Sequence, residues 1–572
     1  MKRVFPIINL ICLGLFLLMV SACGKRTAYT PDQPYWKDND TVSITEPVKR
    51  SPSLIWQLTE RTTFRQAEQL LDLNRSLGKI SGNPKQSWNI NSYDEVPNSS
   101  WFTNRHGLHG MDTEALQAGM AVTSGPDTTG KWTVFRPKVG GVTAGFWIKD
   151  AKGDAYILKF DPPNNPEMAT GSAAITGRLL YACGYNVPQE TITSFHPDDL
   201  VIKEGVTYKE DGRKYPFTRE KLFEILEKAY HNEDGTIRCL ASLALPNIKG
   251  PFSFSGVRKD DPNDWCRHEH RRELRALYVF CSFVNHWDIK DENSMDIFAD
   301  ENGSRFIKHH LLDFGSTMGS AGHGSQSPRS GYANSFDLRD AIVSFFTLGL
   351  KKWQWEEAKP YQYPSIGYFE SEIFHPAKWD PIYPIPAFEN MTNRDAYWAA
   401  KIVMRFSDED LRVLIEVGRY SNPEAREYLF QTLKARRDKI GKHWFSKVNP
   451  LDEFQLIVRE KALTISFTDL LRKYGFDKSK SVSYRYDLQH MGKKIVSGEA
   501  NATPEINITH VERNLLIKAF QEANQDSPDR NLFKISIRTT RDKEKNSRPV
   551  HLWLWFHPED SRIQIVGIEH VD

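Results

Sequence analysis

The spacing of apolar and polar residues changes along the chain, and these changes predict where strands and helices lie. Between residues 131 and 160, short runs rich in aromatic and β-branched residues predict strands at 132–135, 145–148 and 155–160. A turn is expected at 152–154, where the sequence reads Lys-Gly-Asp. Farther along, apolar residues recur at helical spacing, which predicts helices at about 167–183, 218–230, 268–285, 394–405, 407–418 and 423–447.

The regions on either side of this central part follow other patterns. After about residue 452, alternation of polar and apolar residues predicts a small antiparallel β domain at 452–572, with strands around 483–486, 534–537 and 552–555. Residues 24–50 are polar and are expected to form a tether. Residues 51–130 predict a helical and irregular extension, with a helix at 64–77. Within this extension, 94–102 is expected to pack against the domain that follows.

The first 23 residues differ from the rest of the chain. Lys2 and Arg3 precede a 15-residue apolar run, Pro6–Val20, which is shorter than the roughly 20 residues that a membrane-spanning helix needs. A basic start, a short apolar centre and a small-residue end are typical of a secretory signal. The last four residues, Val-Ser-Ala-Cys ending at Cys23, resemble the bacterial lipobox, whose cysteine is acylated. An ordinary signal peptide with a chance cysteine is the alternative.

The lipobox resemblance implies a mature protein held in the bacterial cell envelope by lipid on Cys23. Several acyl chains, each adding about 0.8 kcal/mol per buried CH₂, would give a stable anchor. Gly24 stands where an aspartate is associated with retention in the inner membrane, so the outer membrane is favoured.

Composition excludes some functions. The 75 basic and 73 acidic residues nearly balance, which gives no support for a nucleic-acid partner. Cys183, Cys239, Cys266 and Cys281 are too widely spaced for a disulfide framework or a zinc site. Cys266 and Cys281 are expected to share one helix about 22 Å apart, too far for a bond between them.

Two short motifs carry the candidate chemistry. Residues 286–293 read His-Trp-Asp-Ile-Lys-Asp-Glu-Asn, and 311–315 read Leu-Leu-Asp-Phe-Gly. They resemble the catalytic loop and the metal-binding Asp-Phe-Gly of protein-kinase-like enzymes. Asn302-Gly303 between them predicts a hairpin turn. The stretch from Asp288 to Asp313 is longer than in common protein kinases, and a longer hairpin would accommodate the difference.

The resemblance implies roles that suit the residue types. Phosphoryl transfer needs a carboxylate beside the attacking hydroxyl, which suits Asp288, and oxygen ligands for Mg²⁺, which suit Asn293 and Asp313. Lys290 would neutralise charge on the transferred group, and His286 would orient the loop. ATP, or another nucleotide, with Mg²⁺ is the expected cofactor.

A kinase-like small lobe is expected upstream. Lys159 ends the third predicted strand, where a phosphate-binding lysine belongs, and Glu167 near the start of the next helix is the candidate ion-pair partner. The gap of eight residues between them is shorter than in common protein kinases. A glutamate favoured by the helix dipole is the alternative. The glycine-rich stretch with Gly140, Gly141 and Gly145 is the candidate phosphate-covering loop, although such hairpins also occur as plain turns.

The resemblance implies an α+β, two-lobed protein-kinase-like fold, with the small lobe and an insert at 131–250 and the large lobe at 251–447. Residues 316–330 are rich in glycine and serine, and no Ala-Pro-Glu follows them. This departure favours the atypical branch, such as HipA-like, phosphoinositide-kinase-like or spore-coat CotH-like proteins.

Three hypotheses follow from these patterns. The first is an exported, lipid-anchored atypical kinase that phosphorylates an unknown protein, glycan or small molecule. The scarcity of ATP in the bacterial periplasm and at the outer surface conflicts with it. The second is a non-catalytic envelope protein that uses the kinase-like fold to bind a ligand or partner. The third is a scaffold whose binding part is the last β domain.

Overall fold

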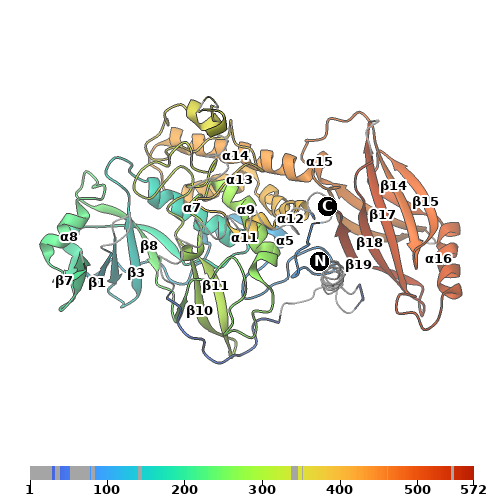
Figure 1. Cartoon of the computed structure of the whole chain (residues 1–572), viewed down its shortest axis with the longest axis horizontal. Helices are drawn as coiled ribbons and strands as arrows, with labels where there is room; N and C mark the ends of the chain where they lie inside the picture. The colour runs from blue at the N-terminus through green and yellow to red at the C-terminus, as the bar shows by residue number, and fades with distance from the viewer. Residues whose placement is uncertain are drawn as a thin grey trace, which may run out of the picture.

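The structure is a computed structural model that describes residues 29–31, 39–51, 78, 84–138, 145–210, 212–335, 345–348, 350, 352–459, 462–542 and 546–572. Cys23, Gly140, Gly141 and the helix expected at 64–77 lie outside the described residues. Figure 1 shows the described parts as a row, with a small lobe at one end, a helical lobe in the middle and a β domain at the other end.

The small lobe is a six-stranded sheet with the order β4-β8-β3-β2-β1-β5. Its strands are β1 (Trp132–Lys138), β2 (Gly145–Lys149), β3 (Ala155–Phe160), β4 (Glu190–Phe195), β5 (Leu200–Ile202) and β8 (Ile237–Leu243). A side hairpin joins β6 (Thr207–Glu210) to β7 (Arg213–Pro216), and a short 3₁₀ helix, η2, spans Pro197–Asp199. The strands expected near 132–135, 145–148 and 155–160 are therefore confirmed.

Alternation along the strands gives this sheet two apolar faces, and a helix covers each. Leu240 and Ile192 share a core with α7 (Met168–Cys183), whereas Leu158 and Phe146 share a second core with α8 (Arg219–Leu226). Each face of the sheet therefore packs against a helix, and Lys159 lies on the face that α7 covers in part.

The helical lobe is built around α9 (Arg272–Val284), which is buried along most of its length. The helices around it and the short helices beside them are α5 (His106–His109), α6 (Thr113–Ala118), α11 (Pro386–Glu389), α12 (Asn393–Arg405), α13 (Asp408–Val417) and α14 (Pro423–Phe445). Three short 3₁₀ helices are η3 (His268–His270), η4 (Asp291–Asn293) and η5 (Gln354–Glu357). A three-stranded sheet, β9 (Ile248–Gly250), β10 (Ser294–Glu301) and β11 (Ser304–Leu311), lies against this lobe.

The single helix expected at 268–285 is wrong in its first turn. Residues His268–His270 form η3, Arg271 is extended with φ −82° and ψ 128°, and α9 begins at Arg272. Cys266 therefore lies outside the helix that holds Cys281. Both remain free thiols, as do Cys183 and Cys239.

The C-terminal part consists of two antiparallel sheets that share one apolar core. The three-stranded sheet has β12 (Leu451–Arg459), β13 (Ala462–Asp469) and β16 (Glu505–Ile508). The five-stranded sheet has the order β15 (Lys493–Asn501), β14 (Val482–His490), β17 (Leu532–Arg541), β18 (Val550–His557) and β19 (Arg562–His570). Two helices, α15 (Leu470–Lys473) and α16 (His510–Glu522), complete this part, and α16 contributes Leu516 and Phe520 to the core.

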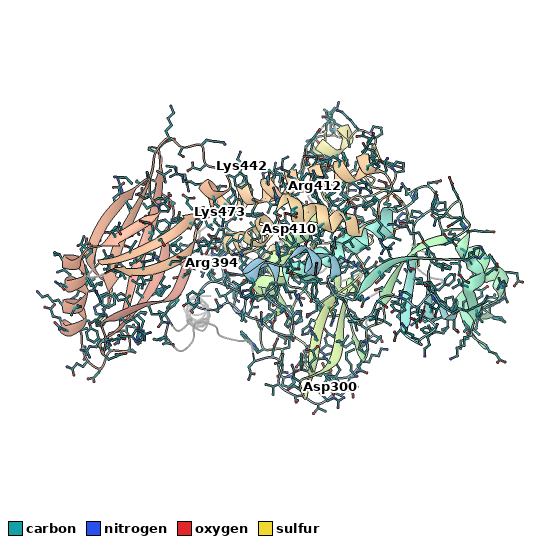
Figure 2. All side chains as sticks on the ribbon, turned by 180° about the vertical axis from the view of Figure 1, so that it is seen from behind. Asp300, Arg394, Asp410, Arg412, Lys442 and Lys473 are labelled. Carbon is teal, nitrogen blue, oxygen red and sulfur yellow. The ribbon has the colours of Figure 1, made fainter. Side chains whose placement is uncertain are left out.

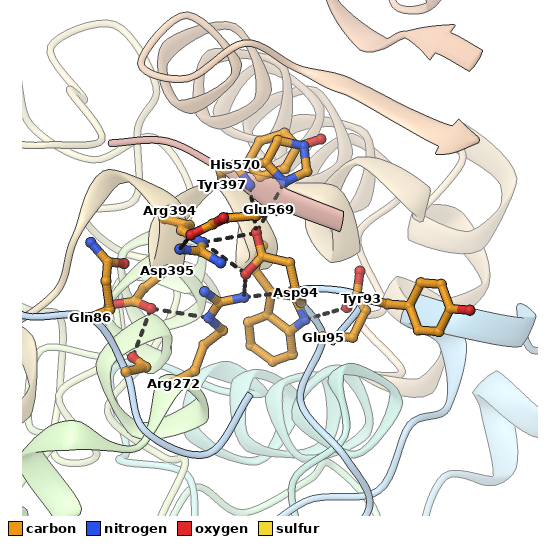
Figure 3. Close-up of polar contacts among 12 residues, drawn as sticks. Gln86, Tyr93, Asp94, Glu95, Arg272, Arg394, Asp395, Tyr397, Glu569 and His570 are labelled. Carbon is orange, nitrogen blue, oxygen red and sulfur yellow. Dashed lines mark hydrogen bonds and ion pairs between the residues drawn. The ribbon is translucent and has the colours of Figure 1, made fainter. Parts of the chain in front are cut away.

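An irregular passage before the small lobe joins the helical lobe to the C-terminal β domain. The Asp94 carboxylate forms ion pairs with Arg272 of α9 at 2.7 Å and with Arg394 of α12 at 2.9 Å. Its other contact is with the ring of His570 of β19, at 3.0 Å, as Figure 3 shows. All of these side chains are buried. Two arginines hold the pKa of Asp94 well below its usual range in spite of its burial.

The described part of the chain contains no helix that is both long enough and apolar enough to cross a membrane. The small lobe is a mostly antiparallel sheet with a packed helix, in which only β1 and β5 pair in parallel among the described strands. It is followed by a buried helix, a hairpin and a helical lobe, which together make up a two-lobed, kinase-like α+β fold. The antiparallel β domain follows it (Figure 1).

Candidate functional site

The hairpin β10–β11 brings the two sequence motifs together. Ser294 at the start of β10 pairs with Leu311 at the end of β11, and the turn falls at Asn302-Gly303. The next residues along both strands also meet, because the Leu312 N–H donates to the Asn293 carbonyl at 2.9 Å. Asp313, which follows Leu312, is therefore placed beside the end of the 286–293 loop.

The 286–293 loop is held by bonds among its own polar residues. Lys290 Nζ donates to Asp288 Oδ1 at 2.7 Å, and Asn293 Nδ2 donates to the Asp288 carbonyl oxygen at 2.8 Å. The side chain of Asp288 is 21% exposed, so a solvent-borne substrate can reach it. Asn293 uses its amide nitrogen in this way, which leaves its Oδ1 available to a cation.

An ion pair across the two lobes is the main contact of the site. Lys159 Nζ at the end of β3 lies 2.8 Å from Asp313 Oδ1. The attraction of Lys159, opposed by burial, lowers the pKa of Asp313 to about 2. Burial works against the charge on Lys159, but Asp313 and Glu190 outweigh it and raise its pKa. Both groups are therefore charged at neutral pH.

His286 is enclosed beneath the site. Its ring packs edge-on against Phe314, with centroids 5.9 Å apart, and its side chain is fully buried. Burial lowers the pKa of His286 to about 4, so the ring is neutral at pH 7. The contact with Phe314 joins the two motifs.

The expected ion pair between Lys159 and Glu167 is wrong. Glu167 caps the start of α7 with φ 67°, and its carboxylate accepts the Ser421 N–H at 2.9 Å. Arg238 Nη1 lies 3.9 Å from the same carboxylate. The short connection from β3 keeps the first turn of α7 beside Arg238, which also faces Asp161 at 3.6 Å.

Glu190 at the start of β4 is the acid that sequence reasoning missed. Lys159 pairs with Leu240 across β3–β8, and Leu240 pairs with Ile192 across β8–β4. Directly paired residues share a face and so do residues two apart, so Glu190 lies on the face that carries Lys159. No local pattern marks Glu190, because its position depends on the order of three strands.

Glu190 is buried without a hydrogen-bond partner for either carboxylate oxygen among the described residues. Burial raises its pKa to about 7, although Lys159 acts in the opposite direction. Gly177 on α7 provides the space beside it, since a Cβ there would lie 3.0 Å from Glu190 Oε2 and 3.4 Å from the Phe314 ring. The charge of Glu190 is therefore poorly compensated.

Of the candidate glycines, only Gly145 lies in the described part of the chain. It begins β2 and pairs with Lys138 on one side and Lys159 on the other. A Cβ on Gly145 would come within 2.3 Å of the Leu158 carbonyl oxygen, so only glycine fits.

The oxygen donors present suit a hard divalent cation. Asp313 and Asn293 offer carboxylate and amide oxygens at one end of the hairpin, which is the donor type that Mg²⁺ takes when substrate phosphates and water supply the rest. Within the described ranges, no group of three or more His, Cys, Asp and Glu residues is arranged to hold a metal ion. The site therefore has the donors for a metal that arrives with phosphate.

No family model and no curated protein matches the chain. Among solved structures, it is similar to the Helicobacter pylori proinflammatory kinase CtkA, at 11% identity and a TM-score of 0.29, over 56% of this chain and 97% of that one. It is also similar to the Golgi casein kinase, at 11% identity and a TM-score of 0.28, over 73% of this chain and 96% of that one. A second structure of the Golgi casein kinase, with Mn/ADP bound, shows 10% identity and a TM-score of 0.28, over 72% and 94% of the two chains. TM-scores this low assign no function to this chain.

Proposed function

We propose that this protein is an atypical kinase that transfers a phosphoryl group from a magnesium-bound nucleotide to a hydroxyl group of an acceptor. The observation that carries the proposal is the convergence of Lys159 from the small lobe with Asp313 at 2.8 Å, beside the Asp288 loop. A lysine, a separate, partly exposed carboxylate and a pair of oxygen donors at one site are the parts that phosphoryl transfer needs.

Asp288 is the base in this proposal. Its carboxylate would accept the proton of the acceptor hydroxyl as that oxygen attacks phosphorus. Lys290, bound to Asp288 Oδ1 at 2.7 Å, places an ammonium beside the incoming phosphoryl group. The Asn293 side-chain amide donates to the carbonyl oxygen of Asp288, and this bond fixes the backbone that carries the base.

Asp313 and Asn293 would hold Mg²⁺, which supplies positive charge to the phosphate oxygens. Asp313 Oδ1 accepts a hydrogen bond from Lys159, and Lys159 would exchange this bond for the phosphate oxygens when a nucleotide binds. Glu190 lies on the same face of the sheet and has no hydrogen-bond partner in the described part of the chain. Lys159 would then lie between Glu190 and the phosphate.

Nucleotide binding by the chain from residue 24 onward tests this proposal. Mg²⁺ with ATP at about 100 times its dissociation constant should stabilise the protein by roughly 2.7 kcal/mol and raise its thermal midpoint. Asp313→Ala should abolish the shift. Asp288→Asn should keep this shift in the thermal midpoint, but its rate of ADP release should be lower by about 10²–10⁴-fold.

Asp300→Asn is the matched control, because Asp300 is an exposed acid on the same hairpin (Figure 2). This variant should bind and turn over ATP as the unmodified chain does. A shift in the unmodified chain without any turnover would favour a non-catalytic binding protein. No shift with any nucleotide would overturn the kinase proposal.

The proposal includes a lipid anchor on Cys23 and a place in the bacterial cell envelope, at the outer membrane. Its support is the sequence pattern of residues 1–23. The Tyr29 ring stacks on Trp553 of β18, with centroids 4.5 Å apart. Five residues lie between Cys23 and Tyr29, and the six steps along the chain span at most about 20 Å, so the anchor would hold the C-terminal sheet near the bilayer. Mass spectrometry of the N-terminal peptide, with Cys23→Ser as the reference, tests for the acyl chains.

A further inference from the structure

Two lysines lie on either side of Gly145 in the small-lobe sheet. Lys138 at the end of β1 pairs directly with Gly145, and Gly145 pairs directly with Lys159 at the end of β3. Residues that pair directly across antiparallel strands project from the same face of the sheet. Lys138 and Lys159 therefore project from one face, two strand spacings or about 10 Å apart at their backbones.

Gly145 leaves the space between the two lysines open. A Cβ placed on it would lie 3.7 Å from Lys138 Cδ, so the Lys138 side chain passes beside the position that Gly145 leaves empty. Lys138 is half-buried, and both Lys159 and Asp313 act on its charge. The side chain of Lys138 thus lies at the same site as the ion pair between the lobes.

The charge on Lys138 has no carboxylate of its own. Lys159 is paired with Asp313 and Lys290 is paired with Asp288, whereas no carboxylate of the described residues lies within ion-pair distance of Lys138. Burial and Lys159 lower the pKa of Lys138, and Asp313 acts in the opposite direction. A half-buried ammonium next to a second ammonium is unfavourable unless an anion joins them.

We propose that Lys138 binds the phosphates of the nucleotide together with Lys159, so that the two side chains form a two-lysine cradle across Gly145. This inference rests on the proposed function and adds a phosphate ligand that the kinase-like motifs do not include. Lysine suits phosphate as a compact charge with three donors on a flexible stem. Two such charges on one face fit a chain of phosphates better than a single one, so the site selects a nucleoside di- or triphosphate over a monophosphate.

Lys138→Gln and Lys149→Gln provide a matched pair of variants. Lys149 lies in the same sheet, at the far end of β2, and is exposed. Binding of ATP, ADP and AMP with Mg²⁺ would be measured by calorimetry on the full-length chain in detergent, at fixed ionic strength. Lys138→Gln should weaken ATP and ADP binding by at least tenfold and AMP binding by much less, and Lys138→Arg should restore most of the affinity. Lys149→Gln should bind all three as the unmodified chain does.

The outcomes separate this inference from the proposed function. If Lys138→Gln binds ATP normally while Asp313→Ala does not, the two-lysine cradle is wrong and the kinase proposal stands. The cradle is also wrong if Lys138→Gln weakens all three nucleotides equally, because the lysine then acts on the fold. If the unmodified chain binds no nucleotide, both proposals fail. The unfolding midpoint without nucleotide shows whether Lys138→Gln folds.

Discussion

The two carboxylates beside Lys159 sit in different surroundings. Asp313 is about half exposed and accepts a hydrogen bond from Lys159. Glu190 is only 4% exposed, and neither of its oxygens accepts a hydrogen bond from the described residues. The same lysine therefore holds Asp313 ionised, with its pKa lowered to about 2, while burial raises the pKa of Glu190 to about 7. Glu190 is therefore about half protonated at neutral pH.

A dependence of stability on pH follows from Glu190. In the unfolded chain a glutamate titrates near 4.3, whereas Glu190 in the folded protein titrates at about 7. The folded state therefore keeps a proton that the unfolded state releases, and the stability from this site falls as pH rises through that window. The total change is about 3.7 kcal/mol, of which about 3 kcal/mol falls between pH 5 and pH 8, and the curve is flat above both pKa values. Glu190→Gln should remove this slope when urea unfolding is measured at pH 5 and pH 8.

Glu204→Gln is the control for this measurement, because Glu204 is exposed in the same lobe. The unmodified protein and Glu204→Gln should lose stability in parallel between pH 5 and pH 8, and Glu190→Gln should lose about 3 kcal/mol less. Parallel curves for all three proteins would mean that Glu190 is ionised throughout, as the partner of Lys159.

At the residue scale, the sequence predicted the residues of the two motifs but not the acid beside Lys159. One short loop contains Asp288, Lys290 and Asn293. Their contacts therefore depend only on local sequence. Glu167 was predicted as the ion-pair partner of Lys159 because the two are close in the sequence. In the structure Glu167 lies beside Arg238 instead. Glu190 reaches the site only through the order β3-β8-β4, which depends on long-range strand pairing.

At the scale of elements, the end of α7 is fixed by the irregular passage before the small lobe. Gly184 caps the helix with φ 121°, and its carbonyl oxygen accepts the Thr103 N–H at 2.9 Å. A Cβ on Gly184 would come within 2.2 Å of the Phe102 ring, and Phe102 belongs to the main core. Both the backbone conformation and the close packing therefore require glycine here.

Gly184→Ala should destabilise the protein by about 2–4 kcal/mol, from backbone strain and from displacement of Phe102. The control is Gly153→Ala, at a turn with φ 91° where a Cβ would meet no atom within 4 Å. That variant should be destabilised by the backbone strain alone, about 1 kcal/mol. Thermal midpoints of the two variants compare the costs directly. Equal losses would show that Phe102 yields freely to an added methyl group.

The helices were predictable where one apolar stripe and a clear end signal coincide. Gly184 ends α7, and Thr392 and Ser407 cap α12 and α13 through their side chains. The first turn of the helix expected at 268–285 was not predictable, because buried contacts interrupt it. Arg271 there stacks over the Trp101 ring at 4.9 Å, a contact with a residue far away in the sequence.

At the scale of the whole molecule, one irregular passage covers the edge of the C-terminal sheet. The Ile568 N–H donates to the Ser92 carbonyl oxygen at 2.8 Å, and the Tyr93 hydroxyl donates to the Ile565 carbonyl oxygen at 2.8 Å. The edge strand β19 is therefore paired rather than open to other chains. The β domain and the helical lobe therefore both contact this passage.

The buried ion pairs around Asp94 in Figure 3 couple the stability of the helical lobe to that of the β domain. Asp94 lies between Arg272 and Arg394, and removing it would leave two buried guanidinium groups without their common partner. Breaking a buried pair in this way costs about 3–5 kcal/mol. We expect the unmodified chain to unfold the helical lobe and the β domain in one calorimetric transition. Asp94→Ala should lower that transition and split it into two.

Arg485→Ala is the control for this coupling, because Arg485 pairs with Glu499 on the exposed face of the β domain at 3.1 Å. An exposed pair contributes about 0.2–1 kcal/mol, so this variant should keep a single transition near the original midpoint. Two transitions in the unmodified chain would show that the Asp94 contacts do not couple the parts. In that case residues 452–572 would be a separable domain, and their deletion would leave the nucleotide-dependent stabilisation of the remaining lobes intact.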